Sequence, residues 1–155
     1  MKRTKKRMTL CIILIALLLI FIWGNSCLPG EVSGAFSNWV KELLSRLFGT
    51  LPGDPQTGHG LLRKLAHFTE FACLGASLCW LGSMLKKKFY IPLICGFLVA
   101  CTDETIQCFI PDRGPAVKDV LIDTAGVAVG LGLLLAATAI NQKIKNNKIL
   151  EETKQ

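Results

Sequence analysis

The stretch LCIILIALLLIFIW, residues 10–23, decides the fold, because it contains no charged side chain and follows the basic segment MKRTKKR, residues 1–7. A basic flank that leads into an apolar run is typical of a segment inserted into a membrane. The run is short for a span, so two interpretations fit it: an uncleaved span, or a signal peptide cleaved at the small residues 24–26 before Cys27. We favour the uncleaved span, with residues 1–24 as an N-terminal membrane anchor.

The composition of the whole chain agrees with a lipid environment. Of 155 residues, 51% are hydrophobic and 19% are charged, and 18 Lys and Arg against 11 Asp and Glu give a net charge of +7. So apolar a sequence excludes a disordered chain, a collagen-like repeat and most soluble nucleic-acid-binding domains. The seven cysteines include no Cys-x-x-Cys pair, and we interpret them as small buried side chains, not as a disulfide scaffold or a zinc site.

Three further apolar segments follow, each long enough to cross a bilayer. They cover residues 65–85, 89–110 and 117–140. We therefore predict an all-α integral membrane bundle of about four transmembrane helices. In this prediction residues 61–140 form a three-helix membrane core, and residues 141–155 form a cytoplasmic tail.

The distribution of basic residues predicts the orientation. Four spans put both termini on one side, and twelve of the 18 basic residues lie on that side. The other side carries Lys41, Arg46, Arg63, Lys64, Arg113 and Lys118. Because cytoplasmic segments carry the excess of Lys and Arg, we expect a multi-pass protein of the cell membrane with both termini in the cytoplasm. The charge of +7 then reflects topology, and no nucleic-acid partner is expected.

The extracytoplasmic loop of residues 25–60 contains a further pattern. Between residues 36 and 48, apolar side chains recur at i, i+3, i+4, i+7 and i+8, and polar residues fall on the opposite face. This spacing predicts an amphipathic helix. It is expected either to lie in the membrane interface or to pack against the mouth of the bundle.

Ionisable side chains within membrane spans are costly and by default indicate a functional site. Each of the three core spans carries such side chains on a single helical face. The candidates for a binding pocket are Arg63, His67 and Glu70 on the first of these spans, Asp103, Glu104 and Gln107 on the second, Asp119 and Asp123 on the third, and Arg113 in the turn between the last two.

The depth of the acidic residues supports one shared pocket. At a rise of ~1.5 Å per residue, Glu70, Glu104 and Asp123 all lie roughly 7–9 Å from the outer end of their spans. The inner halves of these spans contain no acidic residue. We infer a polar pocket that opens outward. Small residues are expected at its floor, and the glycines among them at helix-packing positions: Gly96, Ala100, Gly126 and Gly130.

Charge balance within this pocket predicts an ion-paired network. Arg113 is the expected partner of Asp103 and Glu104, because a guanidinium stays charged and binds carboxylates in a bidentate manner. His67 and Glu70 lie on one helical face and make at most half of a metal site. No metal or other cofactor is therefore expected, and no residue is assigned a catalytic role.

These residues resemble those of the VanZ-like family of small bacterial membrane proteins. The similarity consists of short blocks in a fixed order: RKLAHFTEF at 63–71, DETIQ at 103–107, PDRG at 111–114, KDV at 118–120 and DTAG at 123–126. The first 60 residues match only as a membrane segment. The resemblance implies an integral membrane protein of a bacterium and, through the family's namesake, a link to low-level resistance to glycopeptide antibiotics of the teicoplanin type. It implies no reaction.

Two functions of different classes fit the sequence. The first is a cell-envelope protein whose pocket binds a surface ligand, such as an envelope lipid, a lipid-linked wall precursor or the glycopeptide itself. The alternative is an intramembrane hydrolase or transferase that acts on a lipid or a wall precursor, with acid and base groups from the pocket. A transporter is disfavoured because the inner halves of the spans offer no acidic path across. The predicted partners are the bilayer and, as the ligand of the pocket, an envelope lipid, a wall precursor or a glycopeptide, and the sequence leaves the oligomeric state open.

Overall fold

The computed structural model describes residues 2–30, 58–111, 113–114 and 116–152, together with single positions at 32, 35, 39, 42, 43 and 46. Four long helices account for most of these residues: α1 (Lys2–Ser26), α3 (Gly58–Met84), α4 (Tyr90–Gln107) and α5 (Val117–Glu152). No strand occurs in the described part of the chain, which is all-α as predicted. The predicted amphipathic helix at 36–48 lies outside the described residues, apart from isolated positions.

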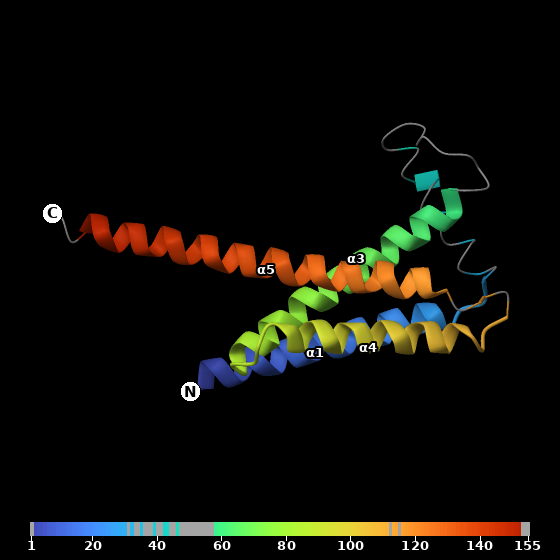
Figure 1. Ribbon diagram of the computed structural model, residues 1–155, viewed down its shortest axis with the longest axis horizontal. Helices are drawn as coiled ribbons and strands as arrows, with labels where there is room; N and C mark the ends of the chain where they lie inside the picture. The colour runs from blue at the N-terminus through green and yellow to red at the C-terminus, as the bar shows by residue number, and fades with distance from the viewer. Residues whose placement is uncertain are drawn as a thin grey trace.

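The helices form a bundle with two distinct ends. Figure 1 shows α1 and α4 side by side, with α3 crossing between them and α5. The most extensive helix–helix interface joins α3 to α5. Both termini and the α3–α4 turn lie at one end, while α1 and α4 finish, and α3 and α5 begin, toward the other (Figure 1). We call this second end the loop end.

All four helices contribute to one apolar core. Its fully buried members are Ile22, Phe71, Leu74, Ala100 and Val127. Partly buried side chains from the same helices pack around them. Because α1 supplies Ile22 to this core, the first helix is a structural part of the bundle and not an appended segment.

Glycines bring the backbones of α3 and α5 into direct contact. A Cβ atom at Gly126 would lie 2.5 Å from the carbonyl oxygen of Phe68, and one at Gly130 would overlap the backbone of Ala72. On α3, Gly75 meets the backbone of α5 in the same way. Small residues four positions apart are the usual means by which helices approach this closely in membranes, where packing replaces the hydrophobic effect as the driving force.

A tight turn makes α3 and α4 antiparallel. Lys86 adopts a left-handed conformation with φ 54°. The N–H of Lys86 donates to the carbonyl of Ser83 (3.3 Å), and the N–H of Lys87 donates to the carbonyl of Gly82 (2.9 Å). This hydrogen-bond pattern is a Schellman motif, which satisfies the last carbonyl groups of α3 and stops the helix. The lysines of this turn therefore lie at the same end of the bundle as the chain termini.

Two helices are longer than the sequence predicted. Helix α3 begins at Gly58 and not near residue 65, and α5 continues to Glu152, beyond the predicted end at residue 140. With 36 residues, α5 is about 54 Å long at ~1.5 Å per residue, and Figure 1 shows it projecting past the other helices. The change from apolar to polar sequence after residue 140 does not end the helix, because Lys, Gln and Glu have high helix propensity.

The exterior of the bundle is apolar. Large hydrophobic side chains are exposed along α1, α4 and α5, among them Ile20 (68%), Leu98 (57%) and Leu133 (66%). Two helices, Thr4–Ser26 and Val117–Glu152, are long and apolar enough to cross a membrane. Soluble proteins rarely expose apolar surface this widely. These helices therefore suit association with a membrane.

Most cysteines lie on this exterior, contrary to the prediction from sequence. Only Cys11 and Cys79 are buried, while Cys27, Cys73, Cys95 and Cys108 are exposed. The prediction treated an apolar neighbourhood in the sequence as burial within the protein. In a bundle with an apolar outer surface, the same neighbourhood also describes the outside.

The glycine contacts yield a stability prediction. We expect Gly130→Ala to lower the free energy of unfolding by about 1–3 kcal/mol, because the added methyl group overlaps the backbone of α3 and forces the helices apart. Gly132→Ala is the matched control on the same helix, because no atom lies within 4 Å of a Cβ at that position. Thermal unfolding of both variants in detergent measures the difference. Equal stability would contradict the proposed backbone contact.

Candidate functional site

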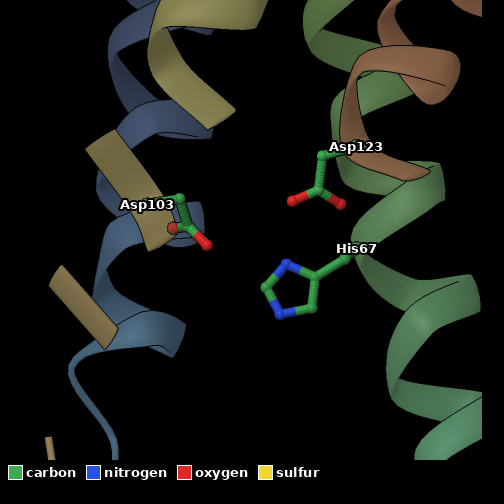
Figure 2. Close-up of side chains that lie close together, drawn as sticks. All are labelled: His67, Asp103 and Asp123. Carbon is green, nitrogen blue, oxygen red and sulfur yellow. The ribbon is translucent and has the colours of Figure 1, made fainter. Parts of the chain in front are cut away.

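Three side chains from three helices meet near the loop end. His67 on α3, Asp103 on α4 and Asp123 on α5 each offer one nitrogen or oxygen atom, and these atoms all lie within 4.8 Å of one another. Figure 2 shows the imidazole ring and the two carboxylates around a common space. Asp103 is fully buried and Asp123 is only 2% exposed. We call these three residues the His–Asp–Asp cluster.

The packing of α3 against α5 positions two members of the cluster. Phe68, whose carbonyl contacts Gly126, directly follows His67 in the sequence. Gly126 in turn lies about one helical turn after Asp123. A side chain at position 126 would separate the two helices and thereby move the imidazole away from the carboxylate. The glycine contact thus sets the geometry of the site as well as the packing of the bundle.

The carboxylate of Asp103 is held at both oxygen atoms. The hydroxyl of Ser26 donates to Oδ1 (2.6 Å), and the side-chain amide of Gln107 donates to Oδ2 (2.9 Å). These two donors fix the plane of the carboxylate and stabilise its negative charge. Each oxygen retains acceptor capacity for a further partner.

The last residues of α1 belong to the site, although the sequence analysis did not select them. The side-chain amide of Asn25 donates to Oε1 of Glu70 (3.3 Å), and Ser26 bonds to Asp103. The sequence does contain a signal for them: two polar residues directly follow the apolar run of α1, where that helix reaches the level of the acidic residues. Interpreting residues 24–26 as a candidate cleavage site hid this role.

Glu104 connects the end of α4 to the beginning of α5. Its Oε2 accepts the backbone N–H of Ala116 (2.8 Å), the residue that directly precedes α5. The first N–H groups of a helix have no acceptor within the helix, and a negative charge is favoured beside them. The buried carboxylate of Glu104 therefore caps the next helix and finds compensation there.

The predicted pairing of Arg113 with Asp103 or Glu104 is wrong. The guanidinium donates instead to the backbone carbonyl of Ser26 (3.4 Å). Asp103 and Glu104 receive hydrogen bonds from neutral groups, which a charge-balance argument does not consider. Arg113 is still close enough to interact electrostatically with both carboxylates. Burial lowers the pKa of its guanidinium and nearby Arg63 lowers it further, while Asp103 and Glu104 offset part of this decrease.

Among the described residues, an ion pair at this end joins Lys64 to Asp119, with Nζ and Oδ1 separated by 3.3 Å. Both side chains are partly exposed, at 42% and 25%. A partly exposed pair of this kind contributes little stability. It places a cation and an anion at the opening of the site and holds α3 beside the first turn of α5.

A small cleft opens beside the His–Asp–Asp cluster. Six of the nine predicted pocket residues line it, namely Arg63, His67, Glu104, Gln107, Asp119 and Asp123. The other three, Glu70, Asp103 and Arg113, join the same network through the end of α1. The cleft has a volume of about 10 Å³, which is enough for a single water molecule. The cleft thus accepts one water or one ion, and a larger ligand reaches only its rim.

The predicted helix-packing glycines and the floor residue lie deeper than this cleft. Gly126 and Gly130 contact α3, and Gly96 contacts the side chain of Val127 on α5. Ala100 is fully buried in the core. These residues set the spacing of the helices beneath the polar groups and do not line the opening.

Several buried polar atoms of the site have no hydrogen-bond partner among the described residues. They are Nδ1 of His67, Oε2 of Glu70, Nε of Arg113 and Oδ1 of Asp119. Buried polar atoms in proteins are nearly always satisfied by protein or by ordered water. Of these residues, His67 and Asp119 line the small cleft, where a bound water or ion would satisfy their atoms.

Comparison with known proteins finds one family model, described as VanZ/LLP1, that matches residues 10–138. The chain belongs to the VanZ/LLP1 family. The match extends the resemblance seen in the sequence, because it begins within α1 and includes Asn25 and Ser26 as well as all the pocket residues of α3, α4 and α5. No curated protein matches the chain, and no solved structure does.

The contact between Ser26 and Asp103 can be tested by removing the hydroxyl group. We expect Ser26→Ala to lower the free energy of unfolding by about 1–3 kcal/mol, because it leaves a buried carboxylate oxygen without its donor. Ser83→Ala is a suitable control, since the Ser83 hydroxyl is exposed and bonds only to the nearby carbonyl of Trp80. Unfolding curves of both variants give the comparison. Equal losses of stability would show that the 2.6 Å hydrogen bond from Ser26 to Asp103 stabilises the protein no more than the exposed hydrogen bond of Ser83 does.

Proposed function

We propose that this VanZ/LLP1 protein is a four-span membrane protein of the bacterial cell envelope whose polar cleft opens on the outer face. The apolar exterior and the two helices long enough to cross a membrane support this proposal. Helices α3 and α4 are less apolar because each carries acidic residues near the loop end. In a membrane these residues face the cleft and one another, so the polar groups stay away from lipid.

The distribution of charge supports the orientation. The termini and the α3–α4 turn lie at one end of the bundle (Figure 1), and the turn contains three lysines. Arg63 and Lys64 in the first turns of α3, and Arg113 between α4 and α5, belong to the other end. Because the first group is larger, the positive-inside rule assigns the termini to the cytoplasm and the loop end to the outside. Helix α1 is retained in this arrangement, since cleavage after residue 26 would remove the groups that bind Asp103 and Glu70.

The function that the geometry supports best is binding of a polar surface ligand at the rim of the cleft, with an effect on susceptibility to glycopeptide antibiotics. The main support for this proposal is that buried charged groups from separate helices lie close together. Such groups are costly to bury, and in membrane helices they usually mark a functional site. Because the cleft is too small for a lipid headgroup or a wall precursor, such a ligand would bind at its rim. Lys64 and Arg63 there offer cations to a phosphate or carboxylate group.

A second candidate function is hydrolysis or group transfer on a lipid or wall precursor. It is favoured by one observation: a buried imidazole nitrogen of His67 without a partner lies beside two carboxylates. An imidazole placed in this way is the usual acid or base of such reactions. Product analysis of a lipid-linked precursor incubated with the purified protein separates this candidate from simple binding.

The topology has a direct test. We expect green fluorescent protein fused after residue 155 to fluoresce, because that end lies in the cytoplasm. Alkaline phosphatase fused after residue 87 is expected to be inactive, and the same enzyme fused after residue 114 to be active, because only the loop end faces outward. The opposite pattern would reverse the orientation of the cleft.

The link to glycopeptides is tested by susceptibility. Cells that express the wild-type protein should tolerate more teicoplanin than cells that lack it, and Asp103→Asn with Glu104→Gln should abolish the difference. Glu151→Gln with Glu152→Gln is the matched control, since it neutralises a second pair of adjacent acids at the exposed end of α5. Immunoblotting confirms equal amounts of each protein. Equal susceptibility with and without the wild-type protein would remove the resistance proposal and leave the membrane fold untouched.

A further inference from the structure

We propose that the His–Asp–Asp cluster is a binding site for one divalent metal ion, with Zn²⁺ as the best fit. The sequence predicted no metal, because His67 and Glu70 on one helix make only half a site. The structure replaces that pair with ligands from three helices, His67, Asp103 and Asp123, whose donor atoms lie within 4.8 Å of one another. Imidazole nitrogens and carboxylate oxygens are both zinc ligands, and the imidazole favours zinc over magnesium or calcium.

The distances suit an ion after a small closure of the side chains. Zinc holds nitrogen and oxygen ligands at about 2.0–2.2 Å, which places neighbouring ligand atoms roughly 3.4 Å apart in a tetrahedron. Rotation of the Asp123 and His67 side chains toward Asp103 supplies the approach, and Figure 2 shows the three side chains directed toward a common space. The adjacent cleft has room for one water molecule, which would complete a four-coordinate site.

The unsatisfied atoms supply an independent observation. Asp123 is 2% exposed, lines the cleft and makes no hydrogen bond to any described residue. Nδ1 of His67 is buried and equally without a partner. A cation between the three residues satisfies both groups at once.

The acidic groups at the loop end also favour a cation. Three of them, Asp103, Glu104 and Asp123, are buried. Buried carboxylates this close require either a proton or a cation between them, and the ligand geometry points to the cation.

Asp103 is held by hydrogen bonds of the kind that orient the ligands of a metal site. Ser26 and Gln107 donate to its two oxygens and leave lone pairs directed elsewhere. Outer partners of this kind orient a ligating carboxylate, and their loss typically weakens metal binding ~10–100-fold. Ser26 also ties α1 to the site, so metal binding would couple the first helix to the other three.

The test uses the full-length protein in detergent or nanodiscs, stripped with a chelator and titrated with Zn²⁺ by calorimetry. We expect one ion per chain, and a rise in the unfolding temperature of the wild-type protein on addition of Zn²⁺. Co²⁺ added in its place should give the absorption bands of a low-coordinate nitrogen and oxygen site. A wild-type protein that binds neither ion overturns the proposal and shows that the cluster holds a proton.

Variants locate the site. Asp123→Asn and His67→Gln are expected to weaken Zn²⁺ binding by more than the ~10–100-fold typical of outer-shell changes, and Ser26→Ala to weaken it within that range. His59→Gln and Glu151→Gln are the matched controls and should bind as the wild type does. Unchanged binding in Asp123→Asn and His67→Gln overturns the assignment of the ligands.

A separate measurement, of stability with and without Zn²⁺, distinguishes the loss of a metal ligand from misfolding of the variant. Without metal, Asp123→Asn should be at least as stable as the metal-free wild-type protein, because it removes one of two neighbouring buried charges. With Zn²⁺ the order should reverse, since only the wild type gains stability from the ion. A variant that is less stable under both conditions, with its Zn²⁺ affinity intact, shows a structural role and contradicts the proposal. These measurements do not depend on the surface-ligand proposal, so either can fail alone.

Discussion

The close approach of two buried carboxylates, Asp103 and Asp123, is the constraint on which the rest of this structure depends. Burial of a charge away from water is costly, and two like charges side by side add mutual repulsion. The loop end is organised to offset that cost. Ser26 and Gln107 donate to Asp103, and the fixed cations of the loop end oppose the remaining negative charge.

The same constraint explains why the fold and the site cannot be separated. The backbone contact of Gly126 with Phe68 holds α3 and α5 together at the turn that carries His67 and Asp123, so the packing glycine also sets a distance in the site. On the other side of the bundle, α1 ends with the hydroxyl that binds Asp103. A membrane bundle has no hydrophobic driving force between its helices. Close packing and buried hydrogen bonds therefore have to provide both cohesion and geometry.

Much of this arrangement follows from the sequence, and the exceptions have physical reasons. Helical periodicity grouped eight of the nine predicted pocket residues, those on α3, α4 and α5, because polar side chains in apolar helices stand out one helix at a time. It did not identify Asn25, Ser26 or the N–H of Ala116, since neutral donors at helix ends look like ordinary loop residues. The Arg113 pairing failed for the same reason: formal charges can be counted from a sequence, whereas backbone and hydroxyl donors become visible only when helices are placed side by side.

The helix ends show a related limit of sequence interpretation. Hydropathy marks where an apolar environment ends, and it placed the end of the last span near residue 140. The backbone of α5 responds to helix propensity and continues to Glu152. Hydropathy and helix propensity place the end of a helix at the same residue where a turn interrupts the chain. This is the case at Lys86, whose left-handed conformation ends α3.

The location of the buried charge also bears on how the protein works. All acidic residues of α3 and α4 lie in the halves of these helices near the loop end, and the apolar remainder of α5 has none before its polar extension. Burial of charge costs less near a membrane surface than at its centre, and an ion or headgroup reaches that level without crossing the hydrocarbon. Transport requires sites or a wet path through the other half as well. The buried acidic side chains therefore lie toward one end of the bundle, and the glycine and aliphatic contacts between its helices lie deeper.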